Sequence, residues 1–165
     1  GRVFRNEGVD REHLQEFDHM EFYAAYMDME GGMKFTEKLY KHIARAVIGE
    51  KMKTEYDGIE IDWSKPFPRV DYFTEFQKET GIDLGADVSV SDLKKKADEL
   101  GIKYEAAYGK GRMIDTLYKK TVRQKLIQPC FLVGHPLEVS PLAKTDSRNP
   151  RKVLRFQPVA ARSEF

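Results

Sequence analysis

The sequence predicts an α+β fold, with a mainly antiparallel sheet flanked by helices. Strand-like and helix-like segments are segregated along the chain, and two of the strand pairs have the pattern of antiparallel hairpins. The 165 residues are enough for one domain, or one large piece of a domain, with its own core. We find no repeat, low-complexity tract or linker that would divide the chain.

The first expected element is a long hairpin, with residues 2–7 and 17–25 as its strands and a ten-residue loop from Gly8 to Phe17. Period-two alternation places two sets of side chains on opposite faces of the second strand: Phe17, His19, Glu21 and Tyr23 on one face, and Met20, Phe22 and Ala24 on the other. The loop carries the charged or titratable residues Asp10, Arg11, Glu12, His13 and Glu16. One face of this hairpin is therefore a candidate functional surface, and the other faces the core.

Residues 33–48 have the spacing of an amphipathic helix that ends at Gly49, and the Gly31–Gly32 pair leaves its start open. Its expected buried stripe consists of Met33, Tyr40, Ile43, Ala44 and Val47. Residues 51–63 then predict a second hairpin around an Asp57–Gly58 turn.

Three helices are expected in the middle of the chain. The first spans about residues 71–80, after two prolines that keep residues 65–69 extended. The second is capped by Ser89 or Ser91 and ends at Gly101. The third spans residues 112–127, with the inward side chains Ile114, Leu117, Tyr118, Thr121 and Val122. We interpret about residues 80–127 as a helical insertion within the domain.

The last third of the chain predicts two strands separated by a loop. Residues 130–133 form a continuous apolar run that is typical of a buried strand. Residues 135–150 are expected to be a loop because their three prolines oppose a regular strand ladder. Residues 153–161 predict a final strand that Pro158 breaks or confines to an edge.

The composition excludes several classes of protein. The chain has 28 Lys and Arg residues against 27 Asp and Glu residues, so no bulk charge favours nucleic acid or a membrane surface. The single cysteine, Cys130, excludes an internal disulfide, and its apolar neighbours suggest a buried thiol. No apolar run approaches the ~18 residues of a membrane span, and the N-terminal segment is too polar for a signal peptide. A cytoplasmic protein is expected.

Several motifs resemble the class II aminoacyl-tRNA synthetases. The segments Phe4-Arg5-Asn6-Glu7 and His13-Leu14-Gln15-Glu16-Phe17, with the loop between them, are similar to motif 2 of that superfamily. Met20-Glu21-Phe22-Tyr23, Ala25-Tyr26 and Met33-x-x-Thr36-Glu37-Lys38 resemble the lysyl enzymes. The segments His135-Pro136, Ser140-Pro141-Leu142-Ala143-Lys144 and Arg155-Phe156 are close to a lysyl-tRNA synthetase signature. The resemblance runs the length of the chain and is weakest between residues 50 and 128.

The resemblance implies that the parent enzyme activates lysine with ATP to lysyl-adenylate and transfers it to tRNA(Lys). Because the lysine carboxylate is already ionised, no general base is required, and catalysis consists of positioning and of neutralising charge on the α-phosphate. A guanidinium suits this task because its planar fork binds phosphate and carboxylate oxygens and keeps its charge. Arg5 is therefore the candidate catalytic residue. The alternative is an ion pair of Arg5 with Glu7 or Glu21 on a solvated face.

The resemblance assigns four further residues to ATP. Glu7 would accept a hydrogen bond from the adenine amino group, Phe17 would stack on the purine, and His13 would lie near the outer phosphates. Glu164 matches the glutamate that binds ATP through Mg²⁺, a cation that prefers carboxylate and phosphate oxygens. The alternatives are a core aromatic for Phe17, an exposed loop histidine for His13 and a frayed end residue for Glu164.

Glu21 and Tyr23 are the candidate lysine-binding residues, Glu21 at the α-amino group and Tyr23 toward the side-chain ammonium. A desolvated ammonium needs such paired, hydrogen-bonding partners. Phe17, Glu21 and Tyr23 share strand parity and span roughly 20 Å, about the length of an aminoacyl-adenylate. The alternative is an ordinary exposed Glu-x-Tyr. The spacing His13-x-x-Glu16-x-x-His19 could suggest a metal site, but it lacks the HExxH pattern.

The chain departs from the family in its loop, where Leu14-Gln15 replaces the usual Asn-Pro. It also departs in the family segments that it lacks. We find no motif 1, anticodon-binding barrel or motif 3 arginine within it, which indicates a fragment that is inactive alone. The parent is expected to be a homodimer. The fragment is expected to self-associate or to be marginally stable, because unpaired sheet edges and apolar surface would be exposed.

Two alternative functions remain. One is the stand-alone paralogue that lysylates an elongation factor, although the long helical insert and the full Ser140–Lys144 segment favour the synthetase. The other is a non-catalytic remnant that binds adenylate or a partner without turnover.

Overall fold

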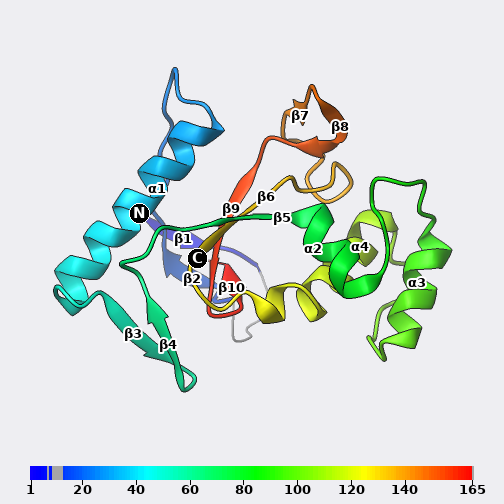
Figure 1. Ribbon diagram of the computed structural model, residues 1–165, viewed down its shortest axis with the longest axis horizontal. Helices are drawn as coiled ribbons and strands as arrows, with labels where there is room; N and C mark the ends of the chain where they lie inside the picture. The colour runs from blue at the N-terminus through cyan, green and yellow to red at the C-terminus, as the bar shows by residue number, and fades with distance from the viewer. Residues whose placement is uncertain (7, 9–12, 165) are drawn as a thin grey trace.

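The computed structural model describes residues 1–6, 8 and 13–164. Figure 1 shows a central sheet with helices at both of its ends. The elements in chain order are β1 (Arg2–Phe4), β2 (Glu16–Asp18), α1 (Met29–Ile48), β3 (Lys53–Tyr56), β4 (Ile59–Asp62), β5 (Arg69–Asp71), α2 (Tyr72–Thr80), α3 (Val90–Glu99), α4 (Lys110–Lys120), the 3-10 helix η1 (Arg123–Lys125), β6 (Cys130–Val133), β7 (Thr145–Asp146), β8 (Asn149–Val153), β9 (Phe156–Ala160) and β10 (Ser163–Glu164).

The central sheet has the strand order β10-β9-β6-β5. β9 pairs antiparallel with both β10 and β6, whereas β5 pairs parallel with β6. The remaining described pairs, β1–β2, β3–β4 and β7–β8, are antiparallel. Helices together with antiparallel-rich sheets confirm the α+β class. The parallel β5–β6 pair was not predicted, since residues 65–69 were expected only to be extended.

The alternation of side chains along β6 separates two hydrophobic clusters. Cys130 and Leu132 pack with Val159 in a large cluster formed with α2, α3 and α4. Phe131 packs on the other side with Phe67 and with Met33 of α1 in a smaller cluster. Helices therefore cover both faces of this strand, which explains why its sequence is apolar throughout rather than alternating.

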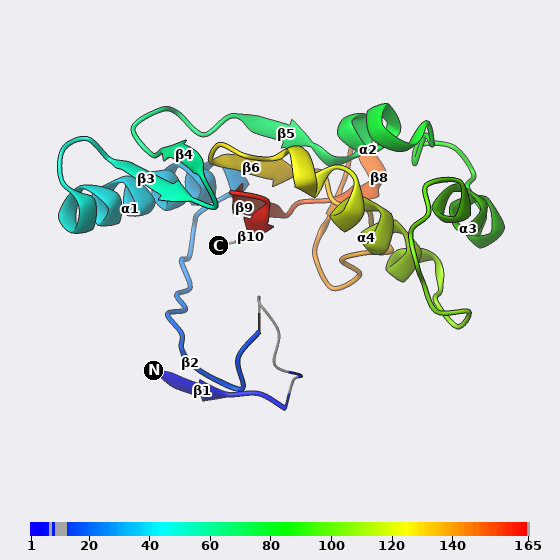
Figure 2. The ribbon, with the colours of Figure 1, turned by 90° about the horizontal axis from the view of Figure 1, so that it is seen from below.

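The first hairpin is much shorter than predicted. β1 and β2 have three residues each, with Arg2 opposite Asp18 and Phe4 opposite Glu16. The prediction of a strand over residues 17–25 is wrong beyond Asp18, because His19 donates to Gly1 and the following residues have no partner in the first strand. Figure 2 shows this hairpin separated from the central sheet, on the side where β10 lies.

Helix α1 begins four residues before its predicted start. The Asp28 side chain accepts a hydrogen bond from the Gly31 amide at 2.7 Å, so the glycine pair lies inside the first turn. Gly49 ends the helix as predicted, with φ of 80°. The predicted buried stripe is too wide: Met33 and Ala44 are buried, but Ile43 is 43% exposed and Val47 76% exposed.

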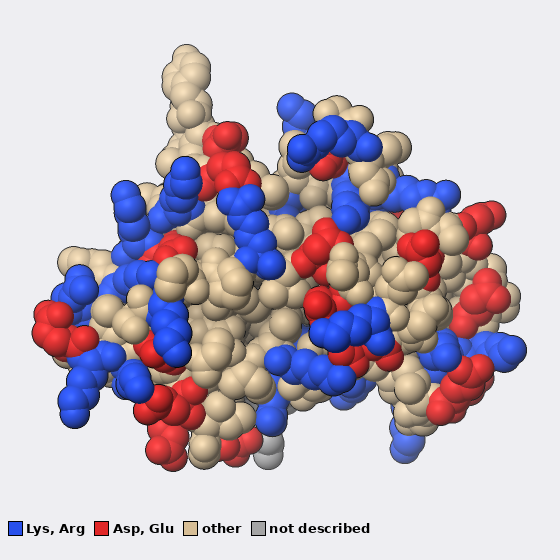
Figure 3. Space-filling view, in the orientation of Figure 1, with Lys and Arg blue, Asp and Glu red and all other residues tan. Residues whose placement is uncertain are grey.

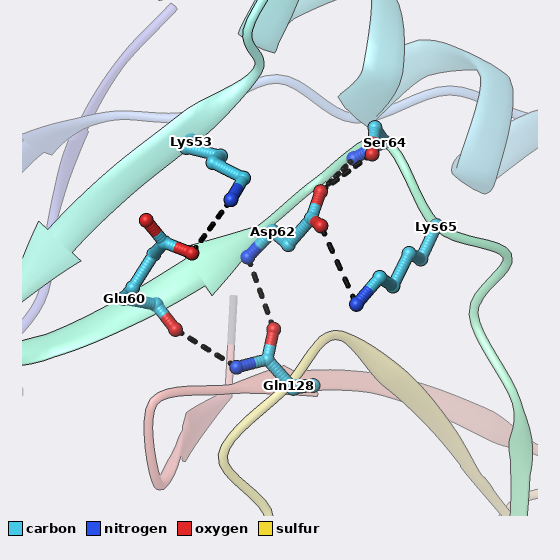
Figure 4. A network of polar contacts seen from close by, with 6 residues as sticks. All are labelled: Lys53, Glu60, Asp62, Ser64, Lys65 and Gln128. Carbon is cyan, nitrogen blue, oxygen red and sulfur yellow. Dashed lines mark hydrogen bonds and ion pairs between the residues drawn. The ribbon is translucent and has the colours of Figure 1, made fainter.

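The β3–β4 hairpin confirms the predicted Asp57–Gly58 turn. Figure 4 shows how this hairpin is attached to the rest of the protein. The Gln128 side chain accepts from the Asp62 amide at 3.0 Å and donates to the Glu60 carbonyl at 2.8 Å, so it extends the edge of β4. Gln128 lies just before β6, and this one amide joins the hairpin to the sheet.

The three predicted helices are present between β5 and β6. Ser89 caps α3 in a capping box with Asp92, as one of the two predicted caps. The third helix is shorter than expected, because α4 ends at Lys120 and residues 123–125 form a separate 3-10 turn. Of its predicted inward side chains, Thr121 is only half-buried, and the others are buried.

The proline-rich segment after β6 contains strands that were not predicted. β7 and β8 form a small hairpin, and Pro150 lies in β8. Pro158 lies inside β9, opposite Phe131, and does not confine that strand to an edge. The Phe131 amide donates to the Pro68 carbonyl, on the side of β6 that faces away from β9. Phe131 and Pro158 are therefore a pair without hydrogen bonds between them, and the N–H that proline lacks is not needed there.

Positive and negative side chains alternate over the face shown in Figure 3, in keeping with the nearly equal numbers of basic and acidic residues. Within the described part of the chain, no helix has the length and apolar character needed to cross a membrane.

Candidate functional site

The short hairpin brings two predicted ATP-binding residues together. The Arg5 guanidinium lies over the Phe17 ring, 5.3 Å from its centroid. The Arg5 amide donates to the Gln15 carbonyl at 2.9 Å, which fixes the backbone where the hairpin opens into its loop. Phe17 is half-buried and also meets His19 edge to face, with ring centroids 6.0 Å apart. Glu7, the third predicted residue of this strand, lies outside the described residues.

Glu21 and Tyr23 lie on the same side of their segment, although that segment is not a strand. The Tyr23 hydroxyl donates to Glu21 Oε1 at 2.5 Å. This acceptor is the main cause that raises the pKa of Tyr23 above its ordinary value. Tyr23 is 91% exposed, so neither side chain is desolvated here. The structure therefore places the two predicted lysine-binding residues together, on an open surface.

His13 and Glu164, which are distant in sequence, line the same cavity of about 670 Å³. Its walls come from the β3–β4 hairpin, the α4–η1 region and the β9–β10 turn, and include Trp63, Lys119 and Arg123. Trp63 donates its indole N–H to Thr54 Oγ1 at 2.9 Å, which fixes the ring against the hairpin. The residues that line the cavity thus include aromatic side chains, basic side chains and the carboxylate of Glu164.

The position of Glu164 follows from strand pairing. Glu164 is opposite Val159, so both side chains lie on the face of the sheet that α2–α4 cover. Glu164 also lines a second, smaller cavity on this face, and Lys119 is the other residue common to both. The two cavities are therefore neighbours at the end of β10.

Among the described residues, no group of three His, Cys, Asp or Glu side chains has the arrangement of a metal site. Glu164 is exposed and forms no ion pair with any other residue that the structure describes. Mg²⁺ in nucleotide sites is held by one or two carboxylates together with substrate phosphates. A single carboxylate at a cavity with basic walls fits such an ion only as part of a nucleotide complex.

The Ser140–Lys144 segment is held by contacts from two directions. The Arg155 guanidinium donates to Ser140 Oγ at 2.6 Å. Lys110, at the start of α4, pairs with Glu138 at 2.9 Å. Gly111 lies so close that a Cβ atom there would be 2.1 Å from the Glu138 carbonyl oxygen. Glu138 therefore attaches the residues just before this segment to the start of α4.

A third and larger hollow, of about 1210 Å³, lies between the start of α1 and this segment. The residues that line it include Phe22, which lies between Glu21 and Tyr23 in the sequence, and Lys144. Phe22 packs edge to face on Phe35 of α1, with ring centroids 4.9 Å apart. Glu21 and Tyr23 themselves line neither this hollow nor the cavity of His13 and Glu164.

Sequence reasoning missed the basic wall formed by Lys119 and Arg123. The signal was the group of basic residues Lys119, Lys120, Arg123 and Lys125, which lie within a predicted helix and were given no role. Arg123 is 9% exposed, and Lys119 pairs with Asp115 one helical turn earlier at 3.1 Å. Only the end of α4 at Lys120 and the turn at η1 bring both side chains to the cavity.

Comparison with known proteins gives one family. The whole chain, residues 1–165, matches the family described as tRNA synthetases class II (D, K and N). The chain is similar to the lysine–tRNA ligase of Leuconostoc mesenteroides, with 42% identity over 165 residues, which is all of this chain and 33% of the relative.

Two further relatives give the same result. The lysine–tRNA ligase of Lactococcus lactis subsp. cremoris is 40% identical over 95% of this chain and 32% of its own length. That of Mycoplasma mobile is 42% identical over 91% of this chain and 30% of its own length. The chain therefore spans about a third of the length of the curated relatives it matches.

Proposed function

The chain belongs to the class II tRNA synthetases of the D, K and N group, and on that premise we propose that it is part of the catalytic domain of a lysine–tRNA ligase. The parent enzyme would activate lysine with ATP and transfer it to tRNA(Lys). The observation that carries this proposal is the cavity shared by His13 and Glu164. These two residues are 151 positions apart in the sequence, and the resemblance implies a role in ATP binding for both.

In this proposal the triphosphate of ATP lies at the cavity of His13 and Glu164. Glu164 would hold Mg²⁺ together with phosphate oxygens, and the ion would supply charge neutralisation at the phosphates. His13 would contact the outer phosphates. Lys119 and Arg123 add positive charge to the same walls, which favours a polyanionic ligand. The outer phosphates would thus be bound by side chains from the loop, the helical segment and β10.

Arg5 would bind the α-phosphate and the lysine carboxylate, and Phe17 would stack on adenine. The contact of Arg5 with the Phe17 ring supports this pairing, because the two side chains already share one face of the hairpin. Glu7 remains the proposed partner of the adenine amino group. No proton transfer is required, so the contribution of Arg5 is electrostatic and geometric.

Glu21 and Tyr23 would bind lysine. Their mutual hydrogen bond supports a joint role, because a carboxylate and a phenol held at 2.5 Å present two acceptors to one ammonium group. Both are exposed in this structure, so the ammonium would have to be covered by other parts of the enzyme for the pair to act in a desolvated site.

The remaining proposals concern the parent protein. We propose that it is a cytoplasmic homodimer, and that residues 80–127 are a helical insertion in a class II catalytic domain with a mainly antiparallel sheet flanked by helices. The placement of α3 and α4 between two adjacent parallel strands supports the insertion, because the chain leaves the sheet at β5 and returns beside it at β6.

A non-catalytic role of this chain alone is the second candidate. It is favoured by the absence of Arg5 and Phe17 from the residues that line the cavity of Glu164. The β1–β2 hairpin also lies apart from the central sheet (Figure 2). In that case the chain would bind adenylate or a partner without turnover. The similarity to relatives named lysine–tRNA ligase gives no support to the elongation-factor paralogue.

The first experiment measures thermal stabilisation by a non-hydrolysable lysyl-adenylate analogue, with arginyl and aspartyl analogues as comparisons. A ligand at 100 times its dissociation constant should add about 2.7 kcal/mol to the free energy of unfolding. We expect stabilisation by the lysyl compound alone. Equal stabilisation by all three analogues, or by none, would contradict a lysine-selective site within these residues.

Variants then test the assigned residues. Arg5→Ala should weaken binding of the analogue, and Glu21→Gln should reduce the preference for its lysyl form. Arg45→Ala and Glu50→Gln are matched controls, because both residues are exposed and pair with each other at the C-terminal end of α1. If the controls weaken binding as much as the site variants do, the assigned roles are wrong.

A further inference from the structure

Helix α1 carries apolar side chains that the rest of the chain leaves exposed. The sequence pattern placed Ile43 and Val47 in the buried stripe of this helix, but they are 43% and 76% exposed. Phe35 is 41% exposed, and Leu39 is half-buried. Phe22 covers part of Phe35, with ring centroids 4.9 Å apart. Figure 1 shows α1 at one end of the molecule, beyond the central sheet and opposite α3.

These apolar residues form a single row, which we call the outer strip: Phe35, Leu39, Ile43 and Val47. Side chains spaced by four residues form one of the ridges with which a helix packs into the grooves of another helix. The core packs on a different side of α1, that of Met33. Single exposed apolar residues are normal on a protein surface, whereas a contiguous row on one helix indicates a contact surface.

A row of basic side chains runs beside the outer strip. Lys34, Lys38 and His42 each directly precede a residue of the strip, so they lie about 100° away around the helix axis. All three are exposed. Neither lysine forms an ion pair with any residue that the structure describes. The surface therefore combines an apolar ridge with unneutralised positive charge along one side.

The charges of α1 argue against a second copy of this chain as the occupant of the strip. Both acidic residues of the helix are already paired, Glu30 with Arg69 and Glu37 with Lys41. An antiparallel contact between two α1 helices would place the basic row of one copy against that of the other, and like charges across an interface are unfavourable. A parallel contact would leave both basic rows without acidic partners. The surface therefore fits a partner of opposite charge.

A membrane surface is the second possible occupant, because anionic lipids attract helices that carry basic residues beside apolar ones. The width of the strip favours a helix over a membrane. Helices that lie in a membrane interface bury a broad apolar face. The exposed apolar side chains of α1 instead form one row between the core side and the basic row, which is the shape that fits a groove on another helix.

We propose that the outer strip binds an amphipathic helix of the parent protein whose apolar side is flanked by aspartate or glutamate. The apolar side of that helix covers the strip, and its acidic residues pair with Lys34 and Lys38. The chain spans about a third of the length of its curated relatives, so a parent of their length contains enough additional chain to supply the helix. The parent as source rests on the proposed function, whereas the chemistry of the surface does not.

The binding test uses the 165-residue protein and two designed peptides of about 20 residues, a length above the ~12–15 residues at which isolated helices are marginal. Both peptides carry a leucine stripe, which one peptide flanks with glutamate and the other with lysine. We expect the glutamate peptide to bind at least about tenfold more tightly in isothermal titration. Equal binding of the two peptides, or binding of neither, would overturn the proposal.

Variants locate the contact. Ile43→Asp and Val47→Asp should each weaken binding of the glutamate peptide at least about tenfold, and circular dichroism checks that both variants remain folded. Leu100→Asp is the matched control, because Leu100 is 44% exposed at the end of α3. The double variant Lys34→Glu with Lys38→Glu should prefer the lysine peptide. An equal loss of binding in Leu100→Asp, or an unchanged preference in the double variant, would contradict the proposal.

Three further measurements identify the occupant. In the parent protein, Val47→Cys should be protected from a maleimide, whereas Lys95→Cys, at an exposed position of α3, should react. Equal reaction of both would overturn the proposal. So would a dimer in sedimentation that Ile43→Asp abolishes, or binding to phosphatidylserine vesicles that the same variant abolishes. If the lysyl-adenylate analogue stabilises the protein but the glutamate peptide does not bind, this inference fails and the proposed function stands.

Discussion

His135 should make the stability of the protein depend on pH well above the range in which carboxylates titrate. Its pKa falls from the ordinary 6.5 to about 4 on folding, because the ring is buried between α2, α4 and the sheet. Between these two values the unfolded chain binds a proton that the folded protein does not. Stability is therefore complete above pH 6.5 and is lost as the pH falls toward 4.

The size of this effect follows from the two pKa values. A difference of about 2.5 corresponds to roughly 3 kcal/mol in total, since each pKa unit is worth about 1.36 kcal/mol. Integration from pH 7 to pH 5 gives a loss of about 2 kcal/mol. The lowered pKa values of Asp71 and Glu138 act in the same direction but at lower pH, because their contributions to stability are lost as the pH falls below the ordinary carboxyl values.

The assay is urea unfolding at pH 7, 6 and 5, on the unmodified protein and on His135→Gln. The variant should lose the dependence of the unfolding free energy on pH, and a variant of the exposed His42, His42→Gln, should keep it. A direct NMR titration of the His135 ring checks the same pKa without a mutation. An unchanged pH dependence in His135→Gln, or a ring pKa near 6.5, would refute the reasoning.

Two further predictions concern packing and attachment. Gly111→Ala should lower the free energy of unfolding by about 1–3 kcal/mol, because its Cβ atom would lie 2.1 Å from the Glu138 carbonyl oxygen. Gly109→Ser, at an open N-cap position, should leave that free energy unchanged or raise it. Chemical unfolding measures both variants. Gln128→Ala should lower the free energy of unfolding by about 1–3 kcal/mol, because it removes two hydrogen bonds to β4. The control Gln77→Ala, at an exposed position of α2, should lower it by only a few tenths of a kcal/mol. The rate of hydrogen exchange of the β3–β4 amides should rise only in Gln128→Ala. Equal effects in either pair would contradict the contact that was assigned.

Local signals in the sequence identified most of the elements. Ser89 caps α3, Gly58 turns the second hairpin, and the apolar run from Cys130 forms a buried strand, because each depends on neighbours within a few residues. The parallel pairing of Arg69 with Phe131 depends on the docking of everything between them, so no local pattern contains it. The prediction that Pro158 confines its strand to an edge was wrong for a related reason. The strand accommodates Pro158 because the Phe131 amide opposite it donates to Pro68 and not to β9.

Only the residues of the candidate site that belong to recognisable family motifs could be predicted from the sequence. The resemblance singled out His13 and Glu164 separately, but their shared cavity arises from the β9–β10 turn and the position of the loop. The role of Lys119 in the cavity wall was not predicted, because several lysines occur in α4 and the sequence does not indicate which turn of the helix faces the sheet. The strand parity of Glu21 and Tyr23 correctly placed their side chains together, although the strand itself ends at Asp18.

The parallel pairing of β5 with β6 also has a consequence for the order of folding. Arg69 and Phe131 are 62 positions apart, so their ladder closes a loop that contains α2, α3 and α4. Closing so long a loop is entropically unfavourable until those helices have shortened it by packing on one another. We therefore expect the helical segment to gain hydrogen-exchange protection first in refolding, and the β6 amides to gain protection only afterwards. The central strand of the protein would then be among the last parts to form.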